Sequence, residues 1–93
     1  MDKSEARQLL LEHLQQYRAR SYGDLLPLLK TPQHTELVGA SGTKYQVEVQ
    51  AFWDLKPQGN VRVRAAIDDG GWRAFMPLVE DFIRAPNGAI VGE

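Results

Sequence analysis

The first third of the chain has the hydrophobic periodicity of an amphipathic helix. Apolar residues recur at intervals of three and four, and charged or amide side chains fill the positions between them; the apolar stripe consists of Ala6, Leu9, Leu10, Leu14 and Tyr17. Asp2 and Glu5 have the spacing of a helix N-terminal cap, with Ser4 as the competing cap. The pattern predicts a helix over about residues 3–19.

A second, shorter helical segment follows. Ser21 and Asp24 repeat the capping spacing, and four leucines follow between residues 25 and 29. Pro27 removes a backbone donor inside this run, so we expect a helix of one or two turns, distorted, that begins at Tyr22. Pro32 then ends the helical part of the chain, which spans about residues 3–30.

From Glu36 onward the apolar period falls to two, which is typical of strands with one buried face. One predicted strand alternates through Tyr45, Val47, Val49, Ala51 and Trp53. A two-residue hairpin loop at Ser41-Gly42 would place Gly39 opposite Lys44 and Val38 opposite Tyr45.

A second alternating strand runs through Val61, Val63, Ala65 and Ile67, and the Asp69-Gly70 pair after it is a strong hairpin signal. A hairpin there predicts three apolar pairs, namely Ile67 with Trp72, Ala65 with Ala74, and Val63 with Met76. After Pro77 the pattern is ambiguous, because residues 78–84 fit either a strand or a loop. The turn at residues 85–88 predicts a final short hairpin between residues 82–83 and 89–91.

These elements predict a single α+β domain over residues 1–93, with helices at about 3–30 and strands at about 36–92. The long N-terminal helix and the short second helix would pack on an antiparallel β-meander of four to five strands. The expected core beneath the helix comprises Tyr45, Val47, Val49, Trp53, Val61, Val63, Ile67 and Trp72. The order of elements is similar to cystatin-like rolls and small NTF2-like folds, a similarity that concerns the fold and carries no function.

Short motifs along the chain resemble a family of small uncharacterised bacterial proteins, a domain of unknown function. They are Ser21-Tyr22-Gly23-Asp24-Leu25, Phe52-Trp53-Asp54, Ile67-Asp68-Asp69-Gly70-Gly71, Pro86-Asn87-Gly88 and Val91-Gly92-Glu93. The resemblance spans most of the chain and implies no activity.

Composition narrows the classes of function. With 43% hydrophobic and 25% charged residues the chain has the balance of a folded domain. The formal net charge of −1 gives no strong attraction to polyanions, and the absence of cysteine excludes disulfides and thiolate chemistry. No apolar run approaches the roughly 20 residues of a membrane span. No secretory signal is evident, so we expect a cytoplasmic protein.

The residues that usually carry chemistry form no catalytic or cofactor motif. His13 lies at the margin of the helical stripe and His34 in a linker, so both are interpreted as structural. Asp68 and Asp69 fit turn-forming positions better than a cation site, which Asp54 or Asp81 would have to complete. We therefore expect no catalytic residue, metal site or cofactor.

One group of residues predicts a binding surface. The sheet face away from the helix would carry Phe52, Arg62, Arg64, Arg73 and Phe75. In the predicted registers Arg62 lies near Phe52, and Arg64 faces Phe75 across the next strand. Arginine with aromatic residues is the usual composition of protein-interface hot spots. In the alternative interpretation the second helix or the terminal hairpin covers this face, and the aromatic rings form a minor core.

The sequence therefore favours a non-enzymatic protein-interaction module with a protein partner. The alternative is a small-molecule binder or isomerase-like roll with a pocket between helix and sheet, in which Asp54 or Glu48 would be the base. Nucleic-acid binding through Arg62, Arg64 and Arg73 is disfavoured by the acidic balance of the chain. Nothing in the sequence sets the oligomeric state.

Overall fold

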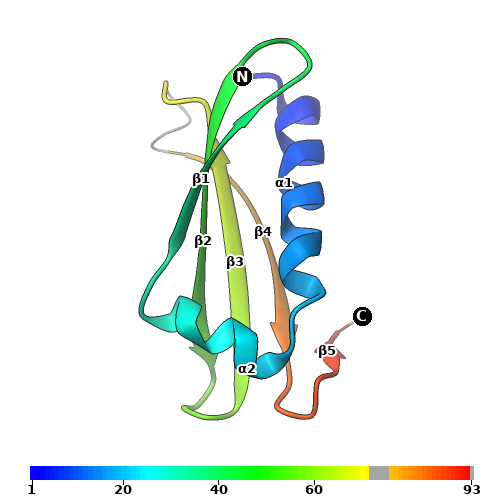
Figure 1. Ribbon diagram of the computed structural model, residues 1–93, viewed down its shortest axis with the longest axis vertical. Helices are drawn as coiled ribbons and strands as arrows, with labels where there is room; N and C mark the ends of the chain where they lie inside the picture. The colour runs from blue at the N-terminus through cyan, green and yellow to red at the C-terminus, as the bar shows by residue number, and fades with distance from the viewer. Residues whose placement is uncertain (72–75, 93) are drawn as a thin grey trace.

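The chain folds into helical segments packed on a five-stranded antiparallel sheet. The computed structural model describes residues 1–71 and 76–92. Its elements are α1 (Lys3–Arg18), α2 (Tyr22–Leu25), the 3₁₀ helix η1 (Leu26–Leu29), β1 (Gln33–Val38), β2 (Lys44–Asp54), β3 (Asn60–Asp68), β4 (Leu78–Arg84) and β5 (Ile90–Val91). The strands form a meander in the order β1-β2-β3-β4-β5, α1 runs along the sheet, and α2 crosses one end (Figure 1). This is the predicted α+β architecture.

The helix boundaries follow the capping residues identified in the sequence. The Oδ1 atom of Asp2 accepts a hydrogen bond from the Glu5 backbone N–H at 3.1 Å, and the Oγ atom of Ser21 accepts one from the Asp24 N–H at 3.1 Å. Pro27 is accommodated because the chain changes from α to 3₁₀ geometry at Leu26, which places proline in the first turn of η1.

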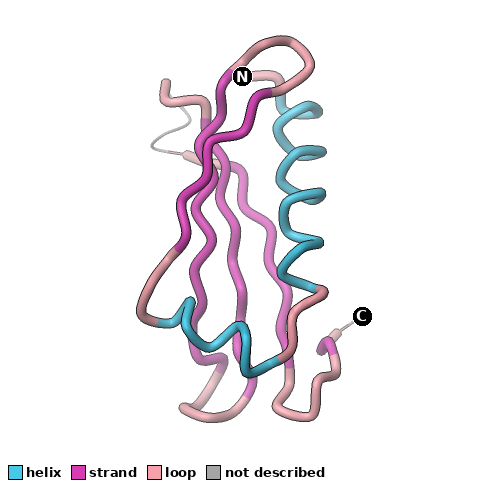
Figure 2. The backbone as a smooth tube through the Cα atoms, in the orientation of Figure 1, coloured by secondary structure: helices cyan, strands magenta, loops and turns pink. Residues whose placement is uncertain are grey.

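The core lies between the helical segments and one face of the sheet, here called the inner face. α1 packs on β3 and β4, and η1 packs on β2 (Figure 2). The fully buried side chains include Leu10, Leu14, Leu25, Tyr45, Val47, Val49, Val61, Val63 and Ile67. Trp53 is half-buried and therefore contributes less than predicted, and Trp72 lies outside the described residues.

The predicted register between β1 and β2 is wrong by one residue. Val38 pairs with Lys44 and Leu37 with Tyr45. The loop holds three residues instead of two, because the Gly39 N–H bonds the Thr43 carbonyl at 2.9 Å and Gly42 has a φ of +86°. A turn closed by a left-handed glycine is the usual form of a three-residue hairpin loop.

The predicted partner of β3 is also wrong. Ile67, Ala65 and Val63 pair with Leu78, Glu80 and Phe82 of β4, not with Trp72, Ala74 and Met76. Trp72 and Ala74 themselves lie outside the described residues. Residues 78–84, which the sequence left between strand and loop, form a strand, and Pro77 stands just before it, where its missing N–H breaks no ladder bond.

The final hairpin is confirmed. Ile83 pairs with Val91 and Arg84 with Ile90, and Gly88 closes the turn with a φ of +92°. The Arg84 side chain is 9% exposed. Its guanidinium donates to the carbonyl oxygen of Arg18 at the C-terminus of α1 and to the Gly88 carbonyl oxygen at 2.8 Å. A cation at this position complements the partial negative charge of the helix end.

The alternation can be tested with Val63→Asp. Val63 is 0% exposed in the centre of β3, and an unpaired carboxylate there should cost several kcal/mol, comparable to the roughly 5 kcal/mol total stability of a marginal small domain. Chemical denaturation followed by circular dichroism measures the loss. Lys44→Asp, at an exposed position of β2 opposite Val38, is the control and should change stability by about 0.5 kcal/mol or less. Equal effects of the two variants would contradict the assigned faces.

Candidate functional site

The sheet face opposite the helices, here called the outer face, carries three of the predicted binding residues, Phe52, Arg62 and Arg64. It is formed by Gln46, Glu48, Gln50 and Phe52 of β2, by Arg62, Arg64, Ala66 and Asp68 of β3, and by Val79, Asp81 and Ile83 of β4. Phe52 is 42% exposed. Leu25 of α2 and Leu28 of η1 belong to the inner core, and Ile90 of the terminal hairpin packs against it. None of these segments therefore provides the internal cover over Phe52 that the alternative interpretation required.

Arg62 is fixed by two carboxylates. Phe52 and Arg62 are cross-strand neighbours, as predicted. The guanidinium nevertheless bonds Asp81 Oδ2 at 2.9 Å and Asp54 Oδ1 at 3.2 Å. These two hydrogen bonds, that of Asp81 first, raise the pKa of Arg62. Arg62 is therefore neutralised within the sheet, and the sequence missed this because the two acids come from different strands.

Arg64 is exposed in the middle of the outer face. Its neighbours are Gln50 of β2 and Asp81 of β4; the prediction that it faces Phe75 is wrong because of the corrected β4 register. Within residues 1–71 and 76–92, Arg64 makes no hydrogen bond or ion pair, since Asp81 bonds Arg62 instead. Phe75 and Arg73 lie outside the described residues.

A hollow lies beside Arg64 on the same face. Its volume is about 250 Å³, and it is lined by His34, Gln46, Val47, Glu48, Ala66, Asp68 and Pro77. The short side chain of Ala66 leaves this space among longer neighbours. His34 lies on β1 and not in a linker, and its Nε2 atom is 3.3 Å from Glu48 Oε2. The two carboxylates, Glu48 and Asp68, give the hollow a negative character. In the sequence, the hollow is indicated by Ala66, a small residue among the polar outer positions of β2 and β3.

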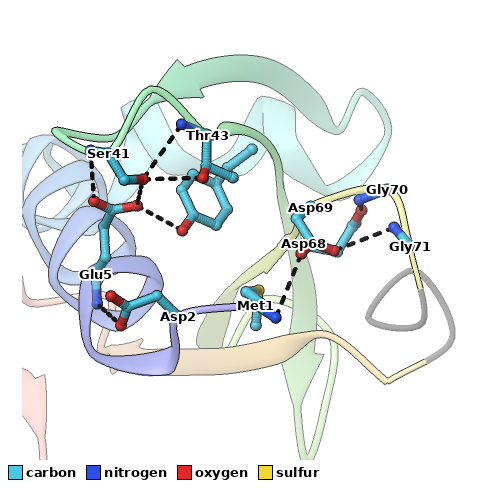
Figure 3. Close-up of polar contacts among 10 residues, drawn as sticks. Met1, Asp2, Glu5, Ser41, Thr43, Asp68, Asp69, Gly70 and Gly71 are labelled. Carbon is cyan, nitrogen blue, oxygen red and sulfur yellow. Dashed lines mark hydrogen bonds and ion pairs between the residues drawn. The ribbon is translucent and has the colours of Figure 1, made fainter.

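The paired aspartates at the end of β3 form turns, as predicted. Asp68 Oδ1 accepts the Gly70 N–H at 2.8 Å, and Asp69 Oδ1 accepts the Gly71 N–H at 3.1 Å. The Met1 amino group lies 3.7 Å from the second carboxylate oxygen of Asp69 (Figure 3). Among the residues that the structure describes, no three acidic or histidine side chains gather in a way that would hold a metal ion.

Glu5 fastens the start of α1 to the β1–β2 loop. Its carboxylate accepts the Ser41 N–H at 3.0 Å, the Ser41 hydroxyl at 2.7 Å and the Tyr45 hydroxyl at 2.7 Å (Figure 3). The bonds from Ser41, and then that from Tyr45, lower the pKa of Glu5. Burial, and then the bond to Glu5, raises the pKa of Tyr45 to about 12. Each group holds the other in one protonation state, which suits a structural contact and not proton transfer near neutral pH.

His13 is more buried than its marginal position in the helical stripe predicted. The side chain is 8% exposed, and its buried Nε2 atom has no hydrogen-bond partner among the described residues. Its ring meets that of Tyr17 edge-on, with centroids 5.6 Å apart. Burial, and then the charge of Arg20, lowers the pKa of His13. The imidazole is thus a neutral component of the core at neutral pH.

Comparisons with known proteins leave the function to be argued from this geometry. No protein-family model, curated protein or solved structure matches the chain. In the described part of the chain, none of the helices has the length and apolar character needed to cross a bilayer.

The Glu5–Tyr45 contact makes a prediction at alkaline pH. Folded Tyr45 keeps its proton up to about pH 12, whereas the unfolded phenol loses it near the reference value of 10.0. Stability should therefore fall as the pH rises from 10 to 12, because the unfolded state then binds fewer protons. Tyrosinate absorbance should show a transition near pH 12 that disappears in Tyr45→Phe. Retention of this transition in the variant would contradict the assignment.

The turn-forming role of the aspartates makes a separate prediction. Asp69→Ala should lower the free energy of unfolding by about 1 kcal/mol or less, because it removes one turn hydrogen bond and a distant amine contact. Addition of EDTA should leave the melting temperature of the unmodified chain unchanged. A chelator-dependent decrease in melting temperature would show instead that these carboxylates hold a cation.

Proposed function

We propose that the chain is a non-catalytic protein-binding module that docks a partner on its outer face. The observation that carries this proposal is Arg64, an exposed arginine at the centre of the face for which the described residues supply no hydrogen bond or ion pair. Phe52, 42% exposed, lies one row away on β2. The resemblance of the short motifs to small bacterial proteins supports placing this module in a bacterial cytoplasm.

The chemistry of the outer face describes the surface that it would bind. Arg62 already has two carboxylates, so it orders the face without needing a further anion. A partner would bring a carboxylate to Arg64 and would bury part of the exposed surface of Phe52 and of Val79, which is 36% exposed. Arginine and aromatic side chains with this exposure are the residues that most often dominate binding energy. The other two predicted residues, Arg73 and Phe75, lie outside the described residues.

The alternative, a ligand pocket between helix and sheet, has less support. Leu10, Leu14 and Tyr45 occupy that space with exposed fractions of 0 to 1%. The two carboxylates considered as a base lie elsewhere: Asp54 is bonded to Arg62, and Glu48 is on the outer face. A pocket at this interface would require core side chains to move.

Site-directed photocrosslinking in cells tests the proposal. A photoreactive phenylalanine analogue replaces Phe52 in one version of the full chain and Leu11 of α1 in a second. Leu11 is the matched control, because it is 39% exposed against 42% for Phe52 but lies on the helix. We expect a discrete adduct from position 52 and none from position 11. Arg64→Glu should reduce that adduct more than tenfold, about 1.4 kcal/mol. A thermal melt should show that the variant still folds, with a modest loss of stability because the new carboxylate faces Asp81.

Two results would overturn the proposal. One is the lack of an adduct from position 52, and the other is an adduct that Arg64→Glu leaves unchanged. The mass of the adduct also identifies what is bound, because a second copy of this chain adds a further 10.5 kDa.

A further inference from the structure

We propose that the partner of the outer face is a second copy of this chain, and that Arg64 of each copy enters the hollow over Ala66 of the other. This inference rests on the proposed function and adds the identity of the partner. It is carried by the arrangement of charges on the face, which is complementary to itself.

The strand register sorts the outer face into rows that run across the sheet. One row contains Glu48, Ala66 and Val79, on β2, β3 and β4 respectively. The next row contains Gln50, Arg64 and Asp81 on the same three strands. The first row includes part of the negative hollow and the second carries the arginine without a described partner. The two rows are about 7 Å apart along the strands.

Two copies can stack outer face to outer face about a two-fold axis that lies between the sheets and runs perpendicular to the strands. This axis places each of the two rows of one copy opposite the other row of the second copy. If the axis passes between the two rows, Arg64 of one copy faces Ala66 of the other, and the same contact occurs twice. This reciprocity is the property of an isologous dimer interface. Face-to-face sheets cross at roughly 30°. This rotation displaces Arg64 and Ala66 little, because both lie near the point where the two β3 strands cross.

The contact would pair opposite charges of the two copies. The guanidinium would reach a hollow flanked by Glu48 and Asp68, and these carboxylates retain acceptor capacity beyond their contacts with His34 and the Gly70 N–H. The same axis sets Asp68 opposite Arg62 in the adjoining rows. An axis parallel to the strands over β3 would instead place Arg64 on Arg64, so charge selects the perpendicular arrangement.

The dimensions fit a weak dimer. Stacked sheets lie about 10 Å apart, a gap that an extended arginine side chain bridges to the backbone level of the opposite sheet. Four strands and four rows cover about 20 Å by 20 Å on each copy, so the two copies would bury roughly 800 Å² together. This total is below that of standard specific interfaces and suits a transient dimer, so we expect a dissociation constant in the micromolar range.

Charge exchange tests the proposal on the purified full chain. Sedimentation equilibrium should show a reversible dimer for the unmodified protein. Arg64→Glu and Glu48→Arg should each weaken it more than tenfold, because each homodimer then contains two like-charge contacts. In an equimolar mixture of the two variants both contacts of a heterodimer again join opposite charges, so the dimer should return.

Glu36→Arg is the matched control. It makes the same charge change on the same side of the sheet, but on edge strand β1. This strand begins at Gln33, so it has no residue in the row that this axis would set opposite Glu36. Dimerisation should be unchanged, and thermal melts should show that all three variants fold.

The outcomes separate this inference from the proposed function. A protein that stays monomeric well above micromolar concentration, a dimer unaffected by both variants, or a mixture that stays monomeric would overturn the second copy as the partner. An adduct of different mass from position 52 that depends on Arg64 would then still support protein binding by the outer face. The lack of any such adduct would overturn both.

Discussion

The packing of helices on one face only of the sheet is the constraint on which the rest of this structure depends. The chain supplies one long helix and one short helical segment, and both lie on the inner face of a five-stranded sheet. The outer positions of the same strands must then be compatible with water. They are largely charged or amide residues, some of which bond across strands, as Arg62 does with Asp81. Arg64 has no such bond among the residues that the structure describes.

Much of the fold could be predicted because the signals were local. The caps at Asp2 and Ser21 act over three residues, and the alternation through β2 and β3 reports burial directly. The errors concern how strands connect. The β1–β2 loop has three residues, with glycine in the left-handed position, where the sequence predicts two. A difference of one residue shifts every cross-strand pair of the two strands.

The β4 error has a different origin. The inner face of this strand carries Glu80 and Arg84, which do not look like core residues in the sequence. Glu80 is paired with Arg7 of α1 at 2.5 Å, and Arg84 binds the carbonyl at the end of the same helix. Both partners are distant in sequence, so the alternation is hidden until the helix is placed. The prediction of the candidate site was incomplete for the same reason. Arg62 and Arg64 were correctly assigned to the outer face, but their different environments depend on the β4 register, which brings Asp81 beside them.

The contacts at the two ends of α1 also govern how the molecule opens. Glu5 holds the first turn to the β1–β2 loop, and Arg84 holds the last turn to the β4–β5 hairpin. The helix is therefore attached to the first and to the last hairpin of the sheet. Detachment of either hairpin would release one end of the helix and expose the core beneath it to water. Amide protons of α1 and of the central strands should therefore exchange with solvent through the same opening event, as a single cooperative unit.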